Sequence, residues 1–335
     1  MPQIINSNLI SLNSQRALST SQGSLQASMQ RLSSGLRVNS AKDDAAGLAI
    51  AERMTSQVRG MNMAMHNAND GISMSQTAEG AMGKVADSLQ RMRELSVQAA
   101  NATNSNSDKD SLDKEFGELS KEIQRVLGGT SFNGQHILGA DAGSHTFQVG
   151  ANTTSNDTID ITTTDLTTDA TITAVAGTDN TGAGRAVIDN TASQATIKGV
   201  IDNIDKAINT VNDSRAVMGA SQNRFESVVS NLQISVENQS AARSRILDTD
   251  YASETANLSR AQILGRALLL GYRLSGGVPE LLDNARLRIG ADMVRLEVCT
   301  AGRVPDSEVV GDRLKLLAQA LGVRGMEVVE VPGGA

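Results

Sequence analysis

The chain has 335 residues, of which 39% are hydrophobic and 20% are charged, and its formal net charge is −7. It contains no Trp, 2 Tyr and 4 Phe. Aromatic side chains dominate ligand pockets and recognition hot spots. The composition therefore argues against an enzyme built around a conventional pocket and favours aliphatic and Met contacts along extended surfaces. A single Cys excludes an internal disulfide framework, and the acidic balance argues against nonspecific binding to nucleic acid.

The sequence pattern gives no sign of a membrane-spanning helix or of a secretory signal peptide. No apolar run approaches the roughly 20 residues that a membrane-spanning helix needs. Residues 1–6 lack the basic and apolar regions of a secretory signal. We therefore expect a chain that either stays in the cytosol or leaves it by a route that reads no such peptide.

Proline is distributed unevenly along the chain. The four prolines are Pro2, Pro279, Pro305 and Pro332, so the absence of proline between residues 3 and 278 permits long helices there. The last 71 residues hold three of these prolines, the only Cys and 11 of the 30 Gly. This change predicts a boundary in the chain near Leu264.

Apolar residues recur near the N-terminus at spacings of three and four, which is the pattern of a narrow helix-on-helix seam. The seam comprises Ile5, Leu9, Leu12, Leu25, Met29, Leu32 and Leu36. A turn follows over 35–44, where Ser40 or Asp43 could cap the next helix.

Three further helices are expected. The first covers 45–103, the second covers 110–127 and ends at Gly128-Gly129, and the third covers 196–246. The last is long enough to pair with the first. Alternating residues at 145–149 and 158–161 predict two strands in the Thr-rich stretch between them.

No catalytic or metal constellation emerges from the residues. His66, His136 and His145 are scattered, without Cys or acidic partners at ligand spacing. The methionines Met61, Met63 and Met65 fit either an adaptable binding surface or core packing on a helix seam. We therefore predict no enzyme activity and no cofactor.

The motifs of residues 1–264 resemble those of bacterial flagellin. They comprise Asn6-Ser7-Asn8, the run from Arg31 to Gly47, Arg93-Glu94-Leu95 with Gln98-Ala99, Phe132-Asn133-Gly134, and the run from Ser244 to Arg260. Residues and resemblance together predict a mainly α fold: a long antiparallel paired-helix, coiled-coil-like stem with a small β-containing insert, plus a small α/β C-terminal appendage.

The resemblance also implies a division of the chain. Residues 1–44 form a filament-core helix and a spoke turn, 45–140 and 190–250 the paired-helix stem, and 141–189 an exposed Thr-rich β insert. Residues 251–264 begin the C-terminal flagellin helix, and 265–335 form an atypical tail.

The resemblance implies a subunit that polymerises with its own copies into the filament used for swimming. It implies export through the flagellar type III apparatus to the cell exterior without a cleaved signal peptide. The implied partners are an export chaperone, a filament cap and the host flagellin-sensing Toll-like receptor. Binding to nucleic acid and insertion into a membrane are not implied.

Three sets of residues carry these roles by resemblance. Receptor recognition maps onto Arg91, Leu95 and Glu122, which could equally be solvated charges and a seam Leu on a long helix. Filament-core packing maps onto the seam from Ile5 to Leu36. The spoke turn maps onto Gly35, Asn39, Lys42, Asp43 and Asp44.

The tail departs from the flagellin pattern after Leu264 and resembles the C-terminal end of the exopolyphosphatase family. A hairpin is expected from 286–289 and 295–298, and a helix from 309 to 321. The catalytic parts of that family are absent, so no phosphatase activity is implied. We expect the N-terminal seam to lose its usual partner, with Leu264, Leu268 and Leu269 as weak substitutes and impaired assembly as the result.

Two alternatives remain at this point. The chain could be a fusion whose tail carries an unrelated regulatory or phosphate-related role. It could also be an adhesin or immune ligand that uses the exposed middle around residues 150–190.

Overall fold

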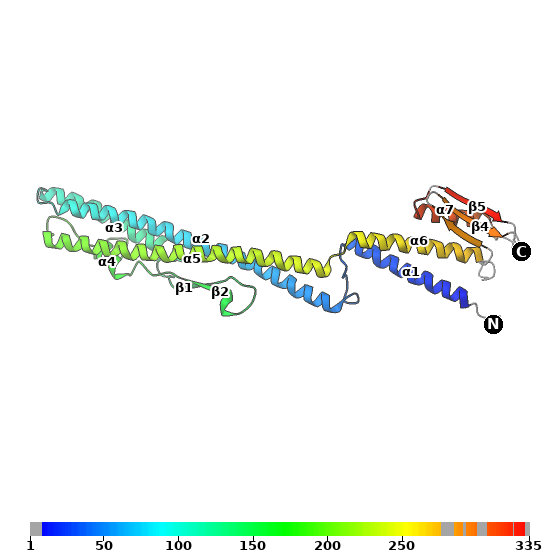
Figure 1. Cartoon of the computed structure of the whole chain (residues 1–335). Helices are drawn as coiled ribbons and strands as arrows, with labels where there is room; N and C mark the ends of the chain where they lie inside the picture. Colours follow the sequence, from blue (N-terminus) through cyan, green and yellow to red (C-terminus); the bar gives the residue numbers. More distant parts are fainter. Residues whose placement is uncertain (1–8, 276–284, 291–292, 300–306, 324, 332–335) are drawn as a thin grey trace. The chain divides into compact units, whose positions relative to one another are not determined.

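The computed structural model describes residues 9–275, 285–290, 293–299, 307–323 and 325–331 (Figure 1). The chain divides into two compact units. Residues 52–242 form the central unit, and residues 1–51 together with 243–335 form the terminal unit.

Three helices build the central unit. They are α2 (Ala45–Ala99), α3 (Asn106–Gly129) and α5 (Gln194–Leu247), of which α2 and α5 contribute their residues between 52 and 242. Figure 1 shows the three side by side. Their buried side chains form one core, whose helix side includes Met82, Leu89, Met92, Phe116, Ile123, Leu127, Ile204, Val211 and Phe225. The aliphatic and Met side chains that dominate the composition are therefore the core.

The predicted bounds of α3 are wrong at its start. The Ser105 side chain accepts a hydrogen bond from the Asp108 N–H, while the Asp108 carboxylate accepts one from the Ser105 N–H at 2.9 Å. This capping box satisfies free N–H groups of the first turn, so the helix begins at Asn106 rather than at 110. The two glycines expected to end α3 lie inside it, and Thr130 closes it by donating its N–H to the Val126 carbonyl at 3.0 Å.

The Thr-rich stretch contains the predicted hairpin. Strands β1 (Ser144–Gln148) and β2 (Thr158–Thr162) pair antiparallel, with Phe147 opposite Ile159. A short 3-10 turn, η1 (Ser155–Asp157), and a helix that the sequence did not predict, α4 (Ala170–Ala176), complete the stretch. Its apolar side chains are buried at Ile159, Ile161, Leu166, Ile172, Val175 and Ile188. The stretch is thus a second layer of the central core, and most of its side chains that face solvent are polar, although Val187 is exposed.

Helices α1 (Leu9–Ser34) and α6 (Tyr251–Ser275) pack along each other in the terminal unit. Helix α6 runs without a break through the composition boundary near Leu264. A helix needs only good backbone propensity and a packed face, and residues 265–270 supply both.

The tail forms a small α/β module that we call the tail module. Its strands β3 (Ala285–Ile289), β4 (Met293–Cys299) and β5 (Gly325–Val331) lie in the order β3-β4-β5, with the first pair antiparallel and the second parallel. Helix α7 (Ser307–Ala320) connects the parallel pair. The predicted hairpin and the predicted helix are therefore confirmed, whereas β5, which follows the helix, was not predicted. Their core consists of Val294, Leu296, Val310, Leu314 and Leu317, joined by Leu270 of α6.

Candidate subunit interface and recognition surfaces

The turn between α1 and α2 is built around the carboxylate of Asp43. Its Oδ2 accepts hydrogen bonds from the N–H groups of Asn39 and Ser40 at 3.1 and 2.9 Å and from the Ser40 hydroxyl at 3.1 Å. These hydrogen bonds, that from Asn39 first, lower the pKa of Asp43. Asp44 rather than Ser40 or Asp43 caps α2, because its Oδ1 accepts the Gly47 N–H at 2.8 Å. Lys42 is exposed.

The same turn is tied to the segment that leads into α6. The N–H of Arg37 donates to the Leu247 carbonyl at 2.6 Å, and the N–H of Thr249 donates to the Gly35 carbonyl at 3.0 Å. Gly35 has a φ of +71°, and a Cβ there would lie 2.9 Å from the Tyr251 hydroxyl. Both the backbone angle and the close approach require glycine. The predicted spoke turn thus joins the two ends of the chain.

The pair of α1 and α6 meets through small and polar side chains. Ser21 and Ser28 are buried, and the Ser21 hydroxyl donates to the Ala261 carbonyl at 3.1 Å. Arg31 and the buried Glu254 form an ion pair at 3.8 Å. Helix α1 therefore has a partner helix within the chain, although the sequence predicted that its seam had lost the usual partner.

The predicted apolar seam of α1 does not coincide with that contact face. Leu12 and Met29 are 52% and 51% exposed, whereas Leu25, Leu32 and Leu36 are partly buried. Ile5 and the side chain of Leu9 lie outside the described residues. Leu264 of α6 is also 52% exposed and lines a groove of about 970 Å³ between the two helices. Leu268 lines the same groove, and Leu269 lines a smaller one of about 280 Å³ on the other side of the pair.

The predicted recognition residues occupy three different environments in the central unit. Arg91 is half exposed and forms ion pairs with Glu94 and Glu115, each at 2.9 Å. Its hydrogen bonds, that with Glu115 first, raise the pKa of Arg91. Leu95 is fully buried in the core, so its side chain is not part of the surface.

Glu122 does not contact Arg91. It pairs with Arg125 at 2.6 Å, and the hydrogen bond from Arg125 lowers the pKa of Glu122. Glu122 lies two helical turns, about 10 Å along the axis, beyond the residue of α3 that does contact Arg91. The acidic partner of Arg91 on α3 is Glu115, which the sequence reasoning did not select.

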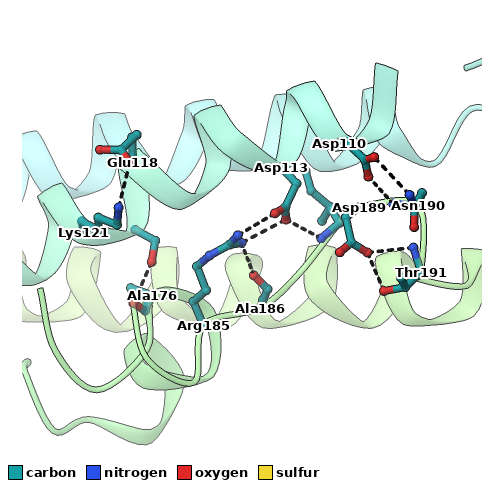
Figure 2. Close-up of polar contacts among 12 residues, drawn as sticks. Asp110, Asp113, Glu118, Lys121, Ala176, Arg185, Ala186, Asp189, Asn190 and Thr191 are labelled. Atoms are coloured by element: carbon teal, nitrogen blue, oxygen red, sulfur yellow. Dashed lines mark hydrogen bonds and ion pairs between the residues drawn. The ribbon is translucent and has the colours of Figure 1, made fainter. Parts of the chain in front are cut away.

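A polar stripe on α3 that the sequence reasoning missed holds the Thr-rich stretch in place (Figure 2). The guanidinium of Arg185 binds Asp113 with its two terminal nitrogens 2.9 and 2.5 Å from the two carboxylate oxygens. The N–H of Ile188 donates to the same carboxylate at 2.9 Å. Burial alone would raise the pKa of Asp113, but the hydrogen bonds from Arg185 and Ile188 outweigh it and lower the pKa.

The stripe continues along the helix in both directions. Asp110 accepts the N–H and the side-chain amide of Asn190, both at 3.0 Å, and the Ser120 hydroxyl donates to the Ala176 carbonyl at 2.8 Å. Gln124 donates to the Gly177 carbonyl at 2.6 Å. These positions follow each other at spacings of three, seven and four, and this helical periodicity is the signal by which the sequence could have revealed them.

Among the residues that the structure describes, no group of three or more His, Cys, Asp or Glu side chains could hold a metal ion. Over the same described ranges, none of the helices combines the length and hydropathy of a membrane span.

Two family models match the chain. Residues 5–143 match the bacterial flagellin N-terminal helical region, and residues 201–268 match the bacterial flagellin C-terminal helical region. The flagellin of Halalkalibacterium halodurans is 44% identical over 264 residues, which cover 79% of this chain and 92% of that protein. The chain belongs to the bacterial flagellin family.

Further similarities agree with this assignment. The flagellin of Bacillus subtilis is 39% identical over 285 residues, covering 78% of this chain and 93% of that protein. A solved structure from Vibrio parahaemolyticus, assigned as a flagellar hook-associated protein, shares the fold with a TM-score of 0.51. At 14% identity it covers 62% of this chain and 100% of its own.

Membership of the family establishes the function at the level of the whole chain. It is a structural subunit of the bacterial flagellar filament, an exported self-assembling protein of swimming motility, and not an enzyme. Both family matches end before residue 269, so the resemblance of the tail to the exopolyphosphatase family stays a prediction, and no finding supports the fusion alternative.

Proposed function

We propose that the copies of this chain contact each other through the exposed part of the α1 seam, and that the seam from Ile5 to Leu36 is the filament-core packing surface. The observation that carries this is the exposure of Leu12 and Met29. Both remain half exposed although α1 already has a partner helix, so they are available to another copy. Large apolar side chains of this kind contribute about 1.5–3 kcal/mol each when they are fully buried.

Polymerisation of purified protein tests this proposal. Met29→Gln keeps the size of the side chain but makes it polar, and we expect it to raise the protein concentration above which filaments sediment. Gln30→Ala is the matched control, because it removes an exposed polar side chain at the next position of the same helix. Equal critical concentrations for both variants would contradict the proposal.

The spoke turn belongs to the same function. The turn contains Gly35, Asn39, Asp43 and Asp44, and the Asn39 side-chain amide also donates to the Leu36 carbonyl at 2.9 Å. In this proposal the exposed Lys42 of the turn is available to a neighbouring copy. Lys42→Ala should weaken filaments without changing the folding of the subunit, as judged by circular dichroism.

We also propose that the surface around Arg91 contacts the host flagellin-sensing Toll-like receptor. Arg91 is exposed and held in place by two carboxylates, which preorganises a charged contact. Leu95 would contribute by supporting α2 from the core, and Glu122 would extend the surface along α3. Arg91→Ala should reduce receptor signalling in a reporter cell, whereas Arg125→Ala, nearly three turns farther along α3 than the Arg91 contact, should reduce it less.

We also propose that the chain is exported through the flagellar apparatus without a cleaved signal peptide. Its partners in this process are a cytosolic chaperone and a filament cap. The family assignment supports it. The chain should appear in the culture medium at its full mass. A strain with an inactivated flagellar export apparatus should retain it inside the cell, and secretion from that strain would contradict this route.

A further inference from the structure

Helix α6 has two contact faces, and the two faces serve different neighbours. One face meets α1 at Glu254 and Ala261, and a Cβ at Gly265 would lie 3.6 Å from the Ser21 hydroxyl. The other face carries apolar residues at a helical spacing of four and three. It comprises Ile263, Ala267 and Leu270.

The tail module covers this second face. Leu270 is only 2% exposed and belongs to the same core as Leu314 and Leu317 of α7. Ile263 and Ala267 pack against that core from the side. The guanidinium of Arg266 donates to the Leu316 carbonyl at 2.6 Å and fixes α7 on α6. Within the described residues, α6 therefore lies between α1 and the tail module.

We propose that the tail module is an intramolecular competitor of subunit packing: it occupies the face of α6 at Ile263, Ala267 and Leu270 and so raises the concentration at which filaments grow. The inference rests on the proposed role of the α1 and α6 pair as the contact region between copies. The face of α6 that α1 does not cover is apolar, so it needs a second neighbour. In a self-assembling subunit, a second copy is the competitor for the face that α1 leaves free.

The covalent tether gives the tail module a strong advantage in this competition. A domain linked by a short connection acts at an effective concentration in the millimolar range. A second copy at micromolar concentration competes poorly with it, even when its own contacts are equally good. Release of the module should therefore change assembly much more than a loss of one surface contact would.

Three variants test the competition. A chain that ends at Ser275 keeps α6 and removes the tail module. Val294→Asp places a charge at a position of β4 that is fully buried in the tail core and lies outside α6, so it unfolds the module with the chain length unchanged. Arg288→Ala is the control, because Arg288 pairs with Glu297 at 3.0 Å on the β3–β4 surface and touches no residue of α6 in any described contact.

We expect the truncation and Val294→Asp to lower the critical concentration for sedimentable filaments at least tenfold, and Arg288→Ala to leave it within twofold of the parent chain. Amide hydrogen exchange in residues 263–270 should speed up in the two released subunits and slow down again in their filaments. Critical concentrations of the truncated chain and of Val294→Asp that stay within twofold of the parent value would overturn the inference. So would a truncated chain that keeps its helix content and does not polymerise.

A second substitution separates this inference from the proposed function. If truncation promotes assembly but Met29→Gln in the truncated chain has no effect, the seam proposal fails and the tail module remains a competitor for α6. If Met29→Gln prevents assembly and truncation changes nothing, the competition fails alone.

Discussion

Asp113 and Arg185 form a two-point ion pair that connects α3 to the extended segment following α4, with nitrogen to oxygen distances of 2.9 and 2.5 Å. The two side chains are only 12% and 20% exposed. The pair is therefore shielded from solvent on most sides, unlike the exposed pairs on the same helix. Arg185 also donates to the carbonyl of the neighbouring Ala186 at 2.8 Å, so the same guanidinium holds the backbone of its own segment.

Removal of one partner of this pair should destabilise the central unit. Arg185→Met leaves the Asp113 carboxylate buried without its cation, and loss of one member of a buried pair costs about 3 kcal/mol. Urea unfolding followed by circular dichroism measures the change. Arg125→Met is the matched control, because its pair with Glu122 is exposed and such pairs contribute less than about 1 kcal/mol. Similar losses of unfolding free energy in both variants would show that Asp113 is not effectively buried.

The same pair predicts how stability depends on pH. The pKa of Asp113 is lowered in the folded chain, so its stabilisation is complete above the unfolded value of about 3.9 and is lost as the pH falls through the lower folded value. The Ser105 hydroxyl and N–H likewise lower the pKa of Asp108 at the start of α3. The stabilisation that these two carboxylates of α3 contribute should therefore stay constant between about pH 5 and 7 and decrease below about pH 4.

Asp113→Asn provides the readout for that dependence. The amide does not titrate, so the loss of stability between pH 5 and pH 3 should be smaller in this variant than in the parent chain. Amide hydrogen exchange in residues 176–190 reports it locally. An unchanged pH profile would assign the acid sensitivity to other carboxylates, such as Asp108.

Gly35→Ala should damage the turn between α1 and α2. Its positive φ of +71° disfavours any residue with a Cβ by about 1–2 kcal/mol, and the new atom would approach the Tyr251 hydroxyl. We expect faster amide exchange at Arg37 and Thr249, whose N–H groups depend on the turn. Gly23→Ala is the control: nothing lies within 4 Å of its added Cβ, and the change should stabilise α1 by up to about 1 kcal/mol.

Gly71→Ala should disturb the centre of the central core. A Cβ on Gly71 would lie 2.8 Å from the ring of Phe225, which is fully buried and packs edge-on against Phe147 with ring centroids 5.6 Å apart. Overpacking of this kind costs about 1–3 kcal/mol. In Gly80→Ala, on the same helix, the added Cβ meets nothing within 4 Å. A lower midpoint of thermal unfolding for Gly71→Ala together with an unchanged or higher one for Gly80→Ala is the expected result.

The sequence by itself determined most of the elements of this protein, but not α4 or β5. Seven-residue spacing of apolar side chains and the absence of proline between residues 3 and 278 predicted the long helices, and alternation predicted β1 and β2. These signals are local, because helix and strand periods depend on residues a few positions apart. The motifs around Arg31 and Ser244 also gave the family, which the comparisons confirmed.

Only the tertiary structure decided which faces meet. The spacing of Leu12 and Met29 shows that they share a side of α1, but it does not say whether α6 covers that side. In the structure both are half exposed, and small residues such as Ser21 and Ser28 are buried instead. The structure likewise shows that Arg91 pairs with Glu115 of α3, a contact that the sequence did not indicate. Partner choice depends on the relative rotation of two helices distant in sequence, and the periodicity of either helix alone does not contain that rotation.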